Sequence, residues 1–159
     1  SGSPGLLTTT ERESRIQQDG ELAHWIEAKG VAKFVDYWES VPLFATQYLL
    51  SEREKLKLRR QRMGNHPIGL ANSLRGMGTG AQRAMYPYLQ SIHLNALFIA
   101  GSEDRKFSDI ARDMTKKVRC SQLEIIPGVG HAPHIEDPST FNRIVLDFLG
   151  TCESLGGPS

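Results

Sequence analysis

The sequence ALFIAGSEDRKF, from Ala96 to Phe107, and the sequence PGVGHAPH, from Pro127 to His134, decide the fold of this chain. The first begins with an apolar run and the second follows another apolar run, and turn residues bound both runs. A helical pattern lies between them. Short apolar runs that alternate with a helix are typical of parallel strands, so the stretch predicts a β-α-β unit and an α/β fold.

A carboxylate and an imidazole follow the two predicted strands: Asp104 comes after the first and His131 after the second. Because the carboxyl ends of parallel strands meet at one edge of a sheet, we expect these side chains to lie side by side. A histidine acts as a base when a carboxylate fixes its tautomer and stabilises the imidazolium. From the residues alone, His131 is explained equally well as a turn residue beside glycines. Glu103 competes as the acid, whereas His134 is expected to line a pocket or fasten the loop.

Most of the chain before this stretch has helical patterns. The first 90 residues contain signals for four or five helices and no strand pattern, with Thr10 as an expected N-cap and a capping-box spacing at Ser51. We predict three parts: a helical region over 1–90, the end of a sheet domain over 91–150, and a disordered tail over 151–159, where apolar periodicity is lost.

Further start signals fall on single residues. Pro67 and Pro138 fit the first position of a helix, and Ser108 is the expected cap of the helix after Asp104. Two strands are too few for the complete parallel sheet of an α/β domain, so further strands are expected from another segment of the domain. Until such strands pair with them, these two would be edges.

Composition excludes several classes of function. Lys and Arg number 19 against 18 Asp and Glu, so the net charge of +1 gives no electrostatic case for nucleic acid or a membrane surface. No apolar run approaches the roughly 18 residues of a membrane span. The two cysteines, Cys120 and Cys152, lack metal spacing and favour a reducing compartment over a disulfide framework.

Several motifs resemble one family. Gly101-x-x-Asp104-x-x-Phe107 and Gly128-x-Gly130-His131 look like the acid and histidine loops of the α/β-hydrolase superfamily, whose catalytic residues occur in the order Ser, Asp, His. Within this superfamily, the sequence of the motifs resembles the MenH branch more closely. MenH proteins are 2-succinyl-6-hydroxy-2,4-cyclohexadiene-1-carboxylate synthases of menaquinone and phylloquinone biosynthesis. The similarity runs from about Ser3 to Leu149, and its further motifs are Ser3-Pro-Gly-Leu6, Trp38-x-x-x-Pro-Leu-Phe44 and Asn72-Ser-Leu-Arg-Gly-Met-Gly78.

The resemblance implies roles for particular residues. Asp104 would be the catalytic acid and His131 the base, with Arg15 and Arg62 binding substrate carboxylates and Tyr37 and Trp38 lining the apolar side of the pocket. Arginine suits this task because its planar fork can bond both carboxylate oxygens. The alternative is that the basic run around Arg62 is a solvated helix face. No metal or organic cofactor is expected.

The nucleophile is absent from these residues, because Gly-x-Ser-x-Gly occurs nowhere in the sequence. The resemblance therefore implies the C-terminal part of an α/β-hydrolase with a helical lid over 1–90. Its partners would be a small-molecule carboxylate and the N-terminal part of the same hydrolase domain. The intact enzyme would be a lyase that removes a proton and expels pyruvate, located in the cytoplasm, or in the plastid stroma if the chain belongs to a fused plant enzyme. The alternatives are a generic ester or carbon–carbon hydrolase and an inactive truncated isoform.

Overall fold

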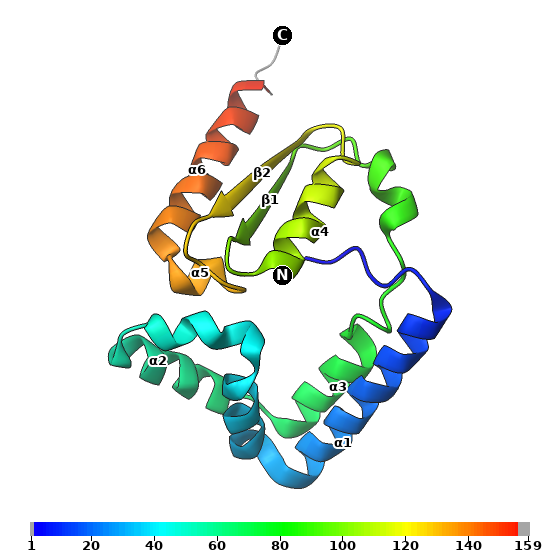
Figure 1. The fold of residues 1–159 in the computed structure, drawn as a ribbon, viewed down its shortest axis with the longest axis vertical. Coiled ribbons are helices and arrows are strands. Elements are labelled where there is room, and N and C mark those ends of the chain that lie inside the picture. Colours follow the sequence, from blue (N-terminus) through cyan, green and yellow to red (C-terminus); the bar gives the residue numbers. More distant parts are fainter. Residues whose placement is uncertain (1, 156–159) are drawn as a thin grey trace. The chain divides into compact units, whose positions relative to one another are not determined.

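The computed structural model describes residues 2–155, with side chains described as far as Cys152. They divide into two compact units (Figure 1). The helical unit is Ser3–Pro87, and the α/β unit comprises the described residues from Tyr88 onward together with Gly2. Each unit contains its own buried side chains, so each is described by itself.

A long helix, α1 (Thr9–Ser40), opens the helical unit. It begins with a capping box, in which the Thr8 hydroxyl accepts from the Glu11 amide and the Glu11 carboxylate accepts from the Thr8 amide. The N-cap is thus Thr8 and not the predicted Thr10, because the acid that completes the box lies three residues after Thr8. Gly30 has a φ of 78° and a ψ of 173°, which are not helical values. It therefore marks a kink within α1, and the helical segments before and after it meet there.

Three shorter helices complete this unit: the 3₁₀ helix η1 (Pro42–Leu49), α2 (Glu52–Met63) and α3 (Pro67–Met77). The predicted capping box of Ser51 is present, and Pro67 occupies the first turn of α3 as expected. Helix α3 lies along α1 (Figure 1), where Ala23, Ile26 and Ala71 are fully buried. The Arg75 guanidinium adds a two-bond pair with Glu27 on α1, at 2.7 and 2.8 Å.

The predicted β-α-β unit is confirmed. After the 3₁₀ helix η2 (Tyr86–Ser91), strand β1 (Ala96–Gly101) pairs in parallel with β2 (Ser121–Ile126), in a register from Ala96–Ser121 to Gly101–Ile126. Helix α4 (Arg105–Thr115) packs against both strands. The short α5 (Pro133–Glu136) then leads to α6 (Pro138–Leu155), which contacts β2 (Figure 1).

Two details of the α/β unit differ from the predictions. Helix α4 is capped by Asp104 and not by Ser108, because the chain turns into the helix directly after β1; Ser108 instead donates from its hydroxyl to the Gly101 carbonyl at 2.8 Å. Helix α6 continues to Leu155 because nothing in residues 151–155 breaks the helix, although apolar periodicity ends near Leu149. The rest of the predicted tail, 156–159, lies outside the described residues.

The described residues contain neither a membrane-crossing helix nor a metal-binding cluster. None of their helices combines the length and apolar character that a bilayer crossing requires. Within the same part of the chain, no group of three or more His, Cys, Asp or Glu side chains is arranged to hold a metal ion.

Candidate active site

The loops that follow β1 and β2 bring Asp104 and His131 together. Asp104 is the N-cap of α4: its Oδ1 accepts from the Phe107 amide at 3.1 Å. Its other oxygen, Oδ2, lies 2.5 Å from Nδ1 of His131. The side chains of Asp104 and His131 are 5% and 14% exposed, so little water competes for this contact. The predicted juxtaposition is therefore present at the carboxyl edge of the sheet.

Backbone contacts fix the two loops to each other. The Ser102 amide donates to the Ile126 carbonyl and the Glu103 amide to the Val129 carbonyl, both at 2.9 Å, and the Gly128 amide donates to the Ser102 hydroxyl at 2.9 Å. Gly101 lies so close to this second loop that a Cβ there would overlap the backbone carbonyls of Val129 and Gly130. The two loops that carry the acid and the imidazole are therefore held together.

This pair can perform acid–base chemistry. In the tautomer that carries its proton on Nδ1, His131 donates to the Asp104 carboxylate, and Nε2 is the nitrogen that can take up a proton. The Phe107 ring meets the imidazole edge to face, with centroids 4.6 Å apart, and limits its rotation. The pair lies in a largely apolar hollow of the α/β unit, whose lining includes Phe98, Met114, Phe141, Val145 and Phe148.

The competing residues make other contacts. The exposed Glu103 carboxylate accepts from the Ser102 hydroxyl at 3.1 Å. His134 is exposed on α5, where its ring lies 5.9 Å from that of Phe141. The hydrogen bond to His131 thus involves Asp104, and the catalytic roles of the pair stay predictions.

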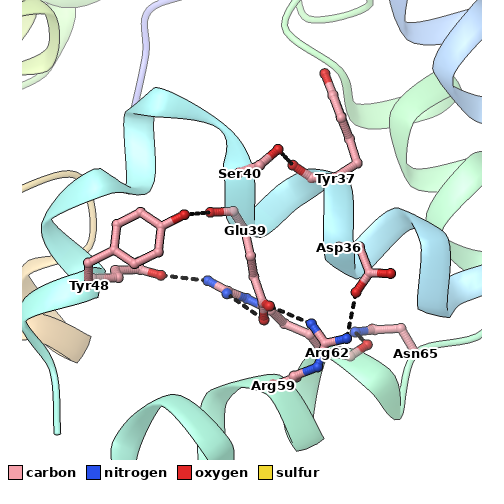
Figure 2. Close-up of polar contacts among 9 residues, drawn as sticks. Asp36, Tyr37, Glu39, Ser40, Tyr48, Arg59, Arg62 and Asn65 are labelled. Atoms are coloured by element: carbon pink, nitrogen blue, oxygen red, sulfur yellow. Dashed lines mark hydrogen bonds and ion pairs between the residues drawn. The ribbon is translucent and has the colours of Figure 1, made fainter. Parts of the chain in front are cut away.

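Arg62 lies in a polar network of the helical unit (Figure 2). Its Nη1 donates to Glu39 Oε1 at 3.2 Å and its Nη2 to Gln47 Oε1 at 2.7 Å, and its guanidinium lies 5.8 Å from the centroid of Phe44. Arg59 adds bonds to Glu39 and Asp36, at 2.5 Å each. Arg62 is 17% exposed, so the structure does not place it on a freely solvated helix face. The neighbouring Arg59 is 41% exposed.

Charge pairing in this network shifts two pKa values in opposite directions. The hydrogen bond from Arg59 lowers the pKa of Asp36 below its ordinary value. The bonds to Asp36 and Glu39 raise the pKa of Arg59. Both shifts favour the charged pair, which joins α2 to the end of α1.

The two predicted aromatic residues make separate contacts. Trp38 lies between Phe34 and Phe44, with ring centroids at 5.3 and 5.1 Å, and thus meets Arg62 through Phe44. The half-exposed Tyr37 packs edge to face on Trp25 at 5.8 Å. A hollow beside the network is lined by Phe44, Gln47, Tyr48, Leu56 and Arg62, among others, but by neither Tyr37 nor Trp38.

Arg15 lies on the first half of α1. Its Nε donates to Asp19 Oδ1 at 2.8 Å, and its side chain is 45% exposed while that of Asp19 is 6% exposed. The pair leaves the end of the Arg15 fork on an exposed surface. Whether Arg15 recognises a carboxylate stays a prediction.

Three residues around these sites were missed in the sequence. Glu136 binds the loop that carries His131, and its signal was an acid five residues after the histidine. Glu39 and Gln47 hold Arg62 from 23 and 15 residues away. No local pattern marks such distant partners.

Comparison with solved structures defines the class of protein. The chain aligns with MenH from S. aureus at a TM-score of 0.92 and 33% identity, over 94% of this chain and 56% of that one. It aligns with an esterase from Thermogutta terrifontis at a TM-score of 0.76 and 18% identity, over 87% and 50% of the two chains, a likeness of fold alone. With its two parallel strands, the chain has the fold of the C-terminal part of an α/β-hydrolase.

The curated relatives that the chain resembles are named as MenH synthases. The chain is 43% identical over 149 residues to a Bacillus subtilis (strain 168) protein that is provisionally named a 2-succinyl-6-hydroxy-2,4-cyclohexadiene-1-carboxylate synthase, covering 94% of this chain and 54% of the relative. It is 30% identical over 149 residues to the synthase of Photorhabdus laumondii, covering 93% and 50%. The resemblance to MenH is thus confirmed, and the chain spans about half the length of these relatives. A scan against models of protein families finds no match.

Proposed function

We propose that this chain supplies the acid, the base and the lid of a MenH-like synthase. The observation that carries the proposal is the 2.5 Å contact between Asp104 Oδ2 and His131 Nδ1 at the carboxyl edge of two parallel strands. The 43% identity to the Bacillus subtilis relative supports a MenH-like function for this contact in particular. The same pair on the fold alone would support a wider range of hydrolases.

In the proposed reaction, His131 Nε2 acts through the hydroxyl of a serine supplied by the N-terminal part of the hydrolase domain. A proton leaves a ring carbon of the cyclohexene substrate, and the electron pair of the broken carbon–hydrogen bond forms the second ring double bond. The carbon–oxygen bond to the departing group breaks, and pyruvate leaves as its enolate, which takes up the proton that His131 has received. Asp104 stabilises the imidazolium during proton transfer.

Two features support an N-terminal hydrolase part as the partner. The described sheet has two strands, and a parallel sheet is normally covered on both faces. The hollow beside Asp104 and His131 is lined by exposed and half-buried apolar side chains, Leu97, Phe98 and Leu149 among them. Such a surface suits contact with further strands and helices of the same domain.

The helical unit is assigned as the lid by the same proposal, and Arg15 and Arg62 are its candidates for binding substrate carboxylates. Arg15, with its half-exposed side chain, is the stronger candidate, because Arg62 is less exposed and already binds Glu39 and Gln47. The free cysteines Cys120 and Cys152 are compatible with a reducing compartment such as the cytoplasm.

The test joins this chain to the N-terminal part of the Bacillus subtilis relative and assays pyruvate release from the MenH substrate. We expect turnover by the joined protein and none by the chain alone, because the residues of a triad act as a unit. A joined protein that folds but releases no pyruvate contradicts the proposal. Turnover by the chain alone would contradict it as well.

A further inference from the structure

The carboxylate of Glu136 holds the backbone on both sides of His131. Its Oε2 accepts from the Gly130 amide at 2.7 Å, and its Oε1 accepts from the Ala132 amide at 3.1 Å. Gly130 and Ala132 are buried. The two oxygens of one side chain thus satisfy two buried N–H groups that flank the candidate base.

This contact restricts the His131 main chain. An amide N–H lies in the plane of its peptide, so the bond from Ala132 restrains the plane that directly follows His131. The bond from Gly130 restrains the plane between Val129 and Gly130, one peptide before the plane that enters the histidine. The main chain is thus held on both sides of His131, which restricts the direction of its Cα–Cβ bond. A shift of about 1 Å in a catalytic group is enough to cost a large factor in rate, so such control is chemically useful.

The acid on the other loop is held independently. Asp104 accepts from the Phe107 amide at 3.1 Å, and its own amide donates to Gly101 at 3.1 Å. The Glu103 amide donates to the Val129 carbonyl at 2.9 Å and thereby attaches the histidine loop at one point. Glu136 lies after the histidine loop in the sequence, at the end of α5, and attaches the loop to that helix.

We propose that Glu136 is a positioning residue that aligns His131 with Asp104, an inference that rests on the proposed function for its effect on rate. Both hydrogen bonds of Glu136 come from backbone amides, and neither involves the imidazole. It acts through the conformation of the loop. Loss of Glu136 should therefore loosen the Asp104–His131 contact before it affects the fold.

The variant Glu136→Gln tests this, because it keeps the side-chain size and one acceptor oxygen while replacing the other by an NH₂ group that cannot accept. Asp137→Asn is the matched control: Asp137 is the next residue, and its Oδ1 accepts from Thr140 to cap α6 and does not contact the histidine loop. An amide retains that acceptor. Both variants are made in this chain and in the joined protein.

The first readout is the proton NMR signal of His131 Nδ1–H, assigned by its loss in His131→Ala. We expect its exchange with water to speed up by a factor on the order of ten in Glu136→Gln and to stay unchanged in Asp137→Asn. In the joined protein, Glu136→Gln should lower kcat by a similar factor and leave KM unchanged, as expected for a group that acts on the base.

The two readouts separate this proposal from the proposed function. An unchanged His131 signal in Glu136→Gln overturns the positioning role, and so does an equal change in both variants, which would indicate a general loss of structure. If Glu136→Gln alone alters the signal, the positioning role stands even where the joined protein has no synthase activity. Circular dichroism checks that each variant is folded.

Discussion

At the scale of residues, two histidines that lie three positions apart in the sequence, His131 and His134, should differ in their effect on the reaction. In the joined protein, His131→Ala should lower kcat by a factor on the order of 10³ or more, because the base that meets Asp104 is removed. His134→Ala should cost much less, because this exposed ring contacts only Phe141 among the ring contacts described. Rates of pyruvate release for both variants are the measurement. Equal losses would show that the base is misassigned.

Arg15 should distinguish a MenH-like lid from that of a generic esterase. If it binds a substrate carboxylate, Arg15→Ala should cost about 2 to 4 kcal/mol, or about 30- to 900-fold in kcat/KM, since the partner charge is left unpaired. Arg15→Lys should restore part of this, because an ammonium keeps the charge and lacks the fork. Hydrolysis of a neutral ester should barely change.

The contact between Arg15 and Asp19 supplies the opposing explanation. Removing the guanidinium also leaves the buried Asp19 carboxylate without its pair on α1, so a purely structural Arg15 would weaken the lid for any substrate. Parallel losses on the carboxylate substrate and the neutral ester would therefore rule out recognition by Arg15. Measuring Tm for both variants separates the structural cost.

How far single residues can be predicted depends on the distance of their partners. Asp104 and His131 follow successive strands, and the rule that parallel strands end at one edge was enough to bring them together. Glu136 is visible in the sequence as an acid five residues after His131, but its partners are backbone N–H groups, which no residue type marks, so its role was not predicted. The network around Arg62 depends on how α2 packs against α1, which no local pattern determines.

At the scale of elements, the cap of α6 should make stability depend on acid pH. The Ser139 hydroxyl, followed by Thr140, lowers the pKa of Asp137 to about 2 from an ordinary 3.8. A carboxylate whose pKa is lower in the folded state stabilises the fold above the unfolded pKa. That stability is lost as the pH falls from about 4 through 2.

Asp137→Asn removes this titration and keeps an oxygen that can accept from Thr140. Between pH 5 and pH 2, wild type should therefore lose more stability than the variant, as measured by urea unfolding at each pH. Other carboxylates with lowered pKa, such as Glu27 beside Arg75, remain in both proteins and cancel in the difference. Identical pH profiles would show that the Asp137 cap does not carry the effect.

Helix boundaries were predictable where one residue type dominates the choice. Ser51 with Glu54, and Pro67, mark helix starts by local chemistry alone, and the structure contains them as expected. At the start of α4, Asp104 and Ser108 are both good caps, and the end of β1 decided between them. The 3₁₀ helix η1 lacks an amphipathic repeat, so apolar periodicity in the sequence did not predict it.

At the scale of the whole molecule, the α/β unit gathers the candidate acid, base and Glu136 within a short stretch of chain. All three lie between β1 and the end of α5, so this candidate site is formed by consecutive elements. The fold class was predictable for that reason, because β1, α4 and β2 follow one another with clear signals. The motif Gly-x-Ser-x-Gly does not occur in the sequence, so only the candidate acid and base could be predicted from these elements.

Gly101 has a consequence for anyone who diversifies this site by directed evolution. Its missing side chain is what lets the β1 loop touch the carbonyls of Val129 and Gly130. A library that randomises positions 101–104 together would therefore spend nearly all of its members on proteins whose two loops are forced apart. Leaving Gly101 fixed and varying the exposed Glu103 instead would keep the loops in register while changing the charge of the residue next to the candidate acid Asp104. In a saturation scan, position 101 should accept glycine and nothing larger.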